Sequence, residues 1–148
     1  MKAVVQRTAR ASVSIDGNTV GRIDRGLLVL LGIEPDDGEA DIEYMVKKCS
    51  GLRIFEDENG KMNLSVQDVG GSILLVSQFT LLGDARKGNR PSFTGAAVPE
   101  KAIPIYERVI SELAKRLPVQ TGVFGADMQV ELVNDGPVTI LLDSKRTY

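Results

Sequence analysis

The groups of this sequence that could do chemistry are hydroxyls, amides, carboxylates and backbone N–H and C=O groups, because His is absent and Cys is rare. The chain of 148 residues has no His and no Trp, and Cys49 is its one cysteine. Without His there is no Ser-His-Asp or Cys-His arrangement and no imidazole base that titrates near neutral pH. One cysteine excludes an intrachain disulfide, a CxxC redox pair and a thiolate metal cage. An enzyme with this composition must use a restricted set of groups.

The first candidate segment is Ser77–Leu81, with the sequence Ser-Gln-Phe-Thr-Leu, at the end of an apolar run. Functional sites often lie at strand ends, since the backbone donors there are no longer used by the sheet. From the spacing alone, two interpretations stay open. The segment carries a site, or Ser77 and Thr80 satisfy local backbone groups while Phe79 packs.

Three further segments combine turn residues with groups that could contact a ligand. Asn134–Thr139 contains a Gly-Pro pair, which suits either a hairpin turn or a rigid feature that presents carbonyl oxygens. Lys87–Phe93 is basic with one aromatic residue, which suits either a phosphate contact or a solvated loop. Thr121–Met128 is glycine-rich, and its Phe124 and Met128 could stack on a base or belong to the core. None of these segments identifies a reaction by itself.

The charges are unevenly distributed, although the formal net charge is only −2. Residues 34–58 hold nine acidic and three basic residues, a balance of −6, which leaves +4 for the rest of the chain. Basic residues gather near the N-terminus, at residues 86–90 and near the C-terminus. This pattern is compatible with a local site for an anionic ligand and also with a mixed solvated surface. A net charge of −2 is not typical of a protein that binds nucleic acid over its whole surface.

Apolar periodicity predicts the elements that position these segments. Strands are expected at residues 3–7, 11–15, 19–23, 27–33, 52–55, 72–78, 128–133 and 138–143. The residues 16–18 and 134–137 are expected to be hairpin turns, one near each end of the chain. Residues 27–33 are apolar on both faces, as a central strand covered on both sides would be.

Two segments have the helical period. Apolar residues within 35–51 follow Asp36 and Asp37, which can cap a helix start, and Gly51 can end the helix. A second helix is expected at residues 99–117, where Pro104 predicts either a kink or a later start near that residue. Before this second helix, residues 83–98 are expected to form a long polar loop.

Together these elements predict one domain over residues 1–148, a mixed α and β fold with largely antiparallel sheets and two main helices. No GxGxxG follows a strand and no GxxxxGK[ST] occurs, so Rossmann and P-loop folds are excluded. The longest strongly apolar run, Leu27–Leu31, is far shorter than the roughly 20 residues of a membrane helix. The N-terminus turns polar too soon for a signal peptide, and a lone cysteine suits a reducing compartment. We therefore expect a cytoplasmic protein without a membrane partner.

Taken in order, these motifs resemble the D-aminoacyl-tRNA deacylases of the bacterial and eukaryotic type. The resemblance spans nearly the whole chain and is most specific in Ser-Gln-Phe-Thr-Leu together with Asn-Asp-Gly-Pro-Val-Thr. It implies a three-layer fold, a homodimer and hydrolysis of the ester between a D-amino acid and the 3′ end of tRNA. The acceptor end of aminoacyl-tRNA would be the partner, no cofactor or metal is implied, and cleavage of glycyl-tRNA stays open.

The resemblance also implies a catalytic segment formed by Ser77, Gln78, Phe79 and Thr80. The backbone N–H groups of Phe79 and Thr80 are the candidates for binding the oxyanion, and Ser77 and Gln78 would shape the pocket. Whether Thr80 is a nucleophile stays open, because no adjacent base is evident in the sequence. In the alternative, the ribose 2′-hydroxyl of the tRNA helps to activate water.

The remaining implied site residues contact the substrate. Gly136–Pro137, with a cis peptide, would project into the site of the partner subunit and exclude an L side chain. Arg7 would brace this Gly-Pro segment, and Phe124 and Met128 would hold the terminal adenosine. Lys87 and Arg90 are candidates for contacts with tRNA phosphates.

Two other classes of function stay open. A non-catalytic dimeric module would bind a nucleotide or an RNA end without turnover. A hydrolase that holds a metal through carboxylates would lose activity with a chelator.

Overall fold

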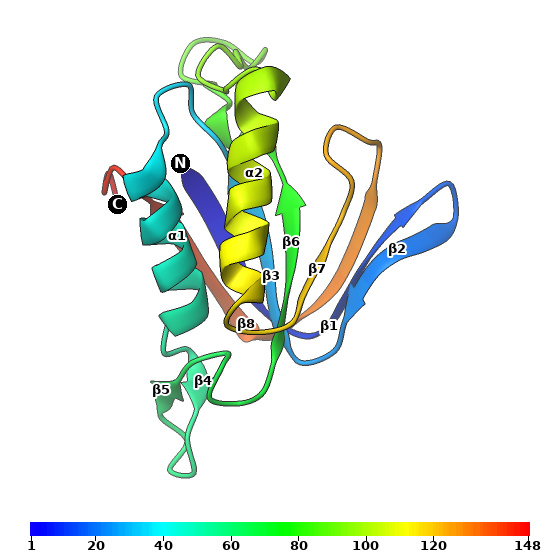
Figure 1. The fold of residues 1–148 in the computed structure, drawn as a ribbon, viewed down its shortest axis with the longest axis vertical. Coiled ribbons are helices and arrows are strands. Elements are labelled where there is room, and N and C mark those ends of the chain that lie inside the picture. The colour runs from blue at the N-terminus through cyan, green and yellow to red at the C-terminus, as the bar shows by residue number, and fades with distance from the viewer.

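The computed structural model describes residues 1–148 (Figure 1). Its elements are β1 (Lys2–Ile15), β2 (Asn18–Ile23), β3 (Gly26–Gly32), α1 (Glu39–Gly51), β4 (Phe55–Glu56), β5 (Met62–Leu64), β6 (Ser72–Ser77), the 3-10 helix η1 (Phe79–Leu82), α2 (Pro99–Ala114), β7 (Val119–Thr121) and β8 (Gln129–Asp143). Neither α-helix combines the length and the apolar character needed to cross a membrane.

The long strand β1 organises the main sheet. It pairs antiparallel with β2, β3 and β8, whereas β3 with β6 and β6 with β7 are parallel pairs. The strand order is β2-β1-β3-β6-β7, and β8 pairs with β1 outside this path. The short strands β4 and β5 form a separate ribbon. The predicted fold class, mixed α and β with largely antiparallel pairing and two main helices, is confirmed.

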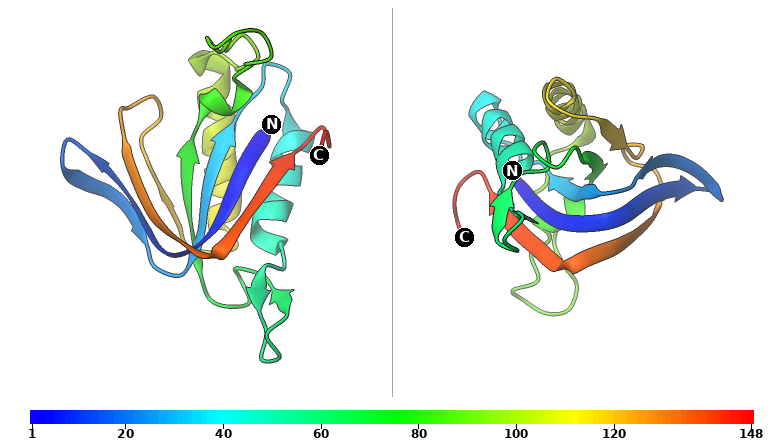
Figure 2. Two further views of the ribbon diagram at one scale, coloured as in Figure 1. Left: turned by 180° about the vertical axis from the view of Figure 1, so that it is seen from behind. Right: turned by 90° about the horizontal axis from the view of Figure 1, so that it is seen from below.

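The sheet is covered on both faces, which gives three layers (Figure 2). Helices α1 and α2 lie side by side on one face, and 24 buried residues, including Leu27, Val29 and Leu75, fill the space between the helices and the sheet. On the other face, the curved far halves of β1 and β8 fold over a smaller cluster that contains Leu28 and Leu74. Because neighbouring residues of β3 and β6 face opposite cores, both strands are apolar on both faces.

The strand β8 differs most from the prediction. The segments 128–133 and 138–143 are not two strands of a hairpin, since both pair with the same strand β1. Gln6 pairs with Thr139 and Thr8 pairs with Asn134, so five steps along β8 oppose two steps along β1. The residues around Gly136 therefore form a large bulge in an edge strand. Likewise, the predicted strands 3–7 and 11–15 are one strand, β1.

The helix starts also differ from the prediction. The N-cap of α1 is Gly38, whose backbone N–H donates to the Asp41 carboxylate at 2.9 Å. The predicted cap was wrong, because Asp37 instead accepts hydrogen bonds from the Met1 ammonium at 2.9 Å and the Glu34 N–H at 2.7 Å. Helix α2 begins at Pro99, so the later start is also wrong. Pro104 lies on the exposed side of α2.

Smaller differences concern short elements. The strand predicted at residues 52–55 is reduced to β4, and β5 and β7 were not predicted. The predicted loop 83–98 is present, with one isolated β-bridge between Asp84 and Ser92.

Candidate active site

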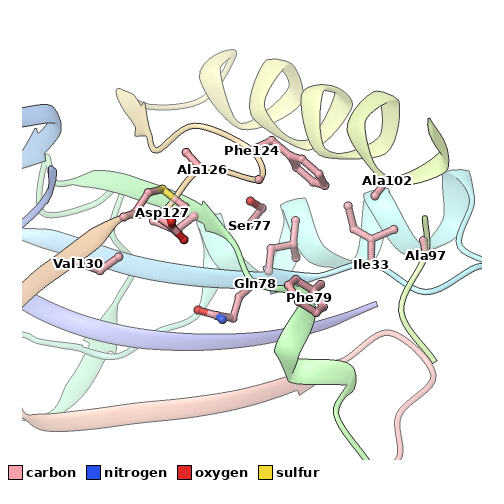
Figure 3. Close-up of a pocket in the computed structure, with 14 residues that line it drawn as sticks. Ile33, Ser77, Gln78, Phe79, Ala97, Ala102, Phe124, Ala126, Asp127 and Val130 are labelled. Atoms are coloured by element: carbon pink, nitrogen blue, oxygen red, sulfur yellow. The ribbon is translucent and has the colours of Figure 1, made fainter. Parts of the chain in front are cut away.

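A cavity of about 280 Å³ opens where β6 ends (Figure 3). It lies between the two cores, because its lining comes from the ends of β3 and β6, the start of α2, the loop before β8 and β8 itself. Ten of the 14 lining residues are hydrophobic; the lining consists of Leu31, Ile33, Val76, Ser77, Gln78, Phe79, Ala97, Ala102, Phe124, Gly125, Ala126, Asp127, Met128 and Val130. Such a mostly apolar hollow with few polar groups is typical of a small-molecule site.

Ser77, Gln78 and Phe79 reach this cavity because the chain leaves the sheet there. The backbone N–H of Gln78 still donates to Leu31 O at 2.7 Å, and the chain then turns into η1. Phe79 is 57% exposed and its ring meets Phe93 edge-on, with centroids 5.3 Å apart. Phe79 and Thr80 are the first residues of η1, so their N–H groups have no acceptor one turn earlier within the helix. These two donors are available to a ligand.

Thr80 lies just outside the lining. Its hydroxyl is exposed and accepts a hydrogen bond from the Gln78 side-chain amide. An amide cannot act as a base, and no carboxylate or amine contacts the hydroxyl. The geometry therefore provides no group in the chain that would remove a proton from Thr80.

Gly32 sets how closely η1 approaches the sheet. A Cβ at this position would meet Leu82 Cδ2 at 2.5 Å and the Gln78 carbonyl oxygen at 3.0 Å. The absence of a side chain at Gly32 thus lets the segment with Phe79 rest directly on the end of β3.

The opposite wall contains Phe124 and Met128. Phe124 packs on Tyr106 of α2, with ring centroids 5.8 Å apart, whereas Met128 packs on the smaller core. The hydroxyl of Tyr106 donates to Leu75 O at 3.0 Å, and burial raises the pKa of Tyr106 to about 12. Tyr106 is therefore neutral at physiological pH and supports the wall that Phe124 forms.

Arg7 is 4% exposed and lies far from this wall. Its guanidinium donates to Ile54 O at 2.8 Å and to Asp135 O at 3.0 Å, and it forms an ion pair with Glu56 at 3.2 Å. Arg7 therefore ties the bulge of β8 to the segment that leads into β4.

Gly136 and Pro137 are exposed and do not line the cavity of their own chain. The peptide between them is cis. The strand register shows how far they lie from the cavity. Gly136 lies beside Arg7 of β1. Arg7 pairs with Leu27 of β3, which in turn pairs with Ile73 at the start of β6. Ser77 is at the other end of β6, roughly 13 Å further along, and three strand spacings of about 4.8 Å add a further ~14 Å across the sheet. The structure therefore brings together Ser77, Gln78, Phe79, Phe124 and Met128, and leaves Arg7, Gly136 and Pro137 as a second group.

Comparison with known proteins identifies the family. Residues 4–143 match the family described as D-Tyr-tRNA(Tyr) deacylase. Proteins named D-aminoacyl-tRNA deacylase from Koribacter versatilis (strain Ellin345) and Anaeromyxobacter dehalogenans (strain 2CP-C) are each 62% identical over 149 residues, which cover 100% of both chains. The chain belongs to the D-aminoacyl-tRNA deacylase family.

Solved structures agree with this assignment of the deacylase fold. A structure described as c-Myc DNA Unwinding Element Binding Protein is 48% identical, with a TM-score of 0.92 over 97% of this chain and 98% of that one. A probable eukaryotic D-amino acid tRNA deacylase is 17% identical, with a TM-score of 0.80 over 95% of this chain and 97% of that one, and supports the fold alone. The family resemblance inferred from the sequence motifs is confirmed.

In this member of the deacylase family, sequence reasoning missed part of the lining. Asp127 is its one ionisable side chain, and Ala97 and Ala102 are small residues that keep the cavity open on the side of α2. Asp127 lies within the glycine-rich segment that contains Phe124 and Met128, so its neighbours in sequence were the available signal. One carboxylate is too few ligands for a metal site.

Proposed function

We propose that the chain hydrolyses the ester of D-aminoacyl-tRNA and releases the free D-amino acid and tRNA. The observation that carries this proposal is the cavity in which the Ser77–Phe79 wall faces Phe124 and Met128, in a chain that belongs to the deacylase family. The walls of the cavity supply apolar faces and backbone donors for the aminoacylated end of a tRNA.

The proposed chemistry needs no His. An aminoacyl ester is already activated, so orientation, oxyanion binding and a placed water suffice in principle. The N–H groups of Phe79 and Thr80 are the proposed oxyanion donors, since neither has an acceptor within η1. Because nothing in the chain activates the Thr80 hydroxyl, we assign the activation of water to the ribose 2′-hydroxyl of the substrate. Ser77 and Gln78 shape the pocket beside the reacting ester.

Phe124 and Met128 are proposed to hold the terminal adenine. A planar ring and a polarizable thioether on one wall suit the face of a base. Contact between Phe124 and Tyr106 keeps the Phe124 ring in place in the free protein. The loop of residues 84–92 lies near the cavity, because Phe93, which follows it, contacts the lining residue Phe79. The loop carries Lys87 and Arg90, which form no ion pair within the chain and are available to phosphates.

We further propose that the protein is a homodimer and that chirality is read by Gly136–Pro137 of the second subunit. The bulge is exposed, lies on an edge strand and is held by Arg7, yet it is far from the cavity of its own chain. Carbonyl groups of the bulge would contact the α-amino group and leave no room for an L side chain. We place the protein in the cytoplasm, which suits its single buried cysteine.

The first experiment compares hydrolysis of matched D- and L-aminoacyl-tRNA with excess chelator present. Rapid loss of the D ester with the L ester spared is the expected result, and glycyl-tRNA in the same assay tests the further substrate. Turnover that stops with chelator would favour a metal hydrolase. Binding of tRNA without turnover would favour a nucleic-acid-binding module. The 48% identical structure is described as a DNA unwinding element binding protein, which is a reason to test this alternative.

A mixed dimer tests whether Gly136–Pro137 acts across subunits. One chain carries Phe124→Ala, which disables its own pocket, and the other carries Pro137→Ala. The one active pocket then belongs to the Pro137→Ala chain and receives an intact bulge only from its partner. Rejection of the L ester by this mixed dimer is expected. L-ester hydrolysis at the rate of the Pro137→Ala homodimer would contradict the proposal.

A further inference from the structure

Asp127 is the one charged side chain in the lining of a cavity that is otherwise apolar or neutral. Its carboxylate has no hydrogen bond and no ion pair within the chain, unlike the carboxylates of Asp41, Asp84 and Asp143. In Figure 3, Asp127 lies in the lining of the same cavity as Ser77 and Gln78, on the loop that also carries Phe124. An unpaired carboxylate at this place attracts a cation and repels an anion.

The loop that carries Asp127 is well defined by its neighbours. The Ala126 N–H donates to Val123 O at 3.2 Å, and Gly125 has a φ of +77°, which a glycine adopts without strain. The residues on either side of this turn, Phe124 and Met128, are both in the lining. The backbone at Asp127 is therefore held beside the proposed adenine-binding wall, and its side chain is exposed.

We propose that Asp127 binds the α-ammonium group of the aminoacyl ester, an inference that rests on the proposed function. The α-ammonium is the cation that every aminoacyl ester carries, whereas the terminal adenosine beside it is neutral and the nearest phosphate is anionic. An ammonium has three N–H donors. Two of them suit the carbonyls of the partner's bulge, which set chirality, and the third is left for a carboxylate. Asp127 supplies the charge that neutral carbonyls lack.

This assignment also orients the substrate. Asp127 repels phosphate at one side of the cavity, while Lys87 and Arg90 on the loop beyond Phe93 attract it at another. An aminoacyl end that enters in reverse would place phosphate against the carboxylate. The charges of the lining and of the loop therefore favour one orientation.

The test combines a substitution with a change of substrate. Asp127→Asn keeps the shape of the side chain and removes its charge, and Glu58→Gln removes an exposed charge remote from the cavity as a control. Each variant is assayed on D-phenylalanyl-tRNA and on the matched D-3-phenyllactyl-tRNA, in which a hydroxyl replaces the α-ammonium. Asp127→Asn is expected to lower kcat/KM about tenfold on the amino ester, which is about 1.4 kcal/mol, mainly through KM. On the hydroxy ester its effect is expected to be less than twofold.

An equal loss on both esters would overturn the assignment, because the carboxylate would then act on a group that both substrates share. A stable probe separates this result from failure of the proposed function. Calorimetry with 3′-deoxy-3′-(D-phenylalanylamino)adenosine measures binding without turnover. Weaker binding to Asp127→Asn than to wild type supports the site even if neither ester were hydrolysed, and equal binding would overturn it.

Discussion

Replacement of Thr80 by alanine should leave this enzyme active. The Thr80 hydroxyl is exposed, contacts only the Gln78 amide and has no base within reach. If the backbone donors and the substrate's own 2′-hydroxyl carry the reaction, the Thr80→Ala variant keeps its N–H and loses less than about tenfold in single-turnover rate, since a backbone donor is unchanged. If Thr80 were the nucleophile, the loss would be roughly 10⁴-fold or more.

The complementary variant moves the backbone and keeps the hydroxyl. In Gly32→Ala, the new Cβ would lie 3.0 Å from the Gln78 carbonyl oxygen, about 0.4 Å inside the ordinary contact distance of 3.4 Å, and 2.5 Å from Leu82 Cδ2. The segment from Gln78 into η1 must therefore shift by several tenths of an ångström. Because a misplacement of ~1 Å costs about 10²-fold, we expect a loss of roughly tenfold.

Both variants are assayed by single-turnover hydrolysis of D-phenylalanyl-tRNA, with circular dichroism and tRNA binding to check the fold. Gly51→Ala is the matched control, since a Cβ there meets nothing within 4 Å. A Thr80→Ala variant that is folded and binds tRNA but has lost all turnover would refute the backbone mechanism. A Gly32→Ala variant with the wild-type rate would refute the role given to the position of η1.

Four further outcomes are expected. Arg7→Lys removes at least one of two charge-assisted hydrogen bonds to backbone carbonyls, at a cost of about 2 kcal/mol. Calorimetry should show a Tm roughly 4–8 °C lower, and an unchanged Tm would contradict the bracing role. Gly122→Ala places a Cβ 2.5 Å from Met128 Sδ, so it should raise KM for D-aminoacyl-tRNA by displacing Met128; an unchanged KM would remove Met128 from the adenine site. Burial raises the pKa of the Cys49 thiol to about 12, so a maleimide should not label the native protein at pH 7.5, whereas full labelling would show that the core opens. Burial raises the pKa of Asp143, but hydrogen bonds from a hydroxyl and a backbone N–H lower it below its usual value. A lowered carboxyl pKa stabilises the fold above the unfolded pKa of about 3.9 and loses that contribution as pH falls. The Tm should therefore fall below about pH 4, and less steeply in Asp143→Asn.

Local patterns predicted the central strands and the two main helices, because the spacing of apolar residues along the chain determines these elements. Leu27–Leu31 is apolar at every position, and the structure places neighbouring residues of this run in the two different cores. The bent strand β8 could not be predicted this way. Asn134–Pro137 has the local composition of a hairpin turn, but a hairpin and a bulge differ in which distant strand pairs with the flanking residues.

The same limit applies to the candidate site. A strand end at Ser77 was visible in the sequence, and so was the aromatic character of the segment with Phe124. That these two walls face each other depends on the parallel pairing of β6 with β7, which carries the second segment to the end of β6. Asp127 has no pattern of its own, because a single exposed carboxylate in a loop is ordinary until the cavity around it is known.

The pairing of β1 with β8 has a consequence for how the protein is made. Lys2 leaves the ribosome 141 residues ahead of its partner Asp143, in the longest ladder of the sheet. At about 5–20 residues per second, the edge of β1 stays uncovered for roughly 7–28 seconds before the whole of β8 has been made. An uncovered strand edge is a site of association with other chains. Synthesis of this protein therefore includes a window in which β1 depends on chaperones or on the nascent chain itself for protection, and the window closes only when β8 emerges.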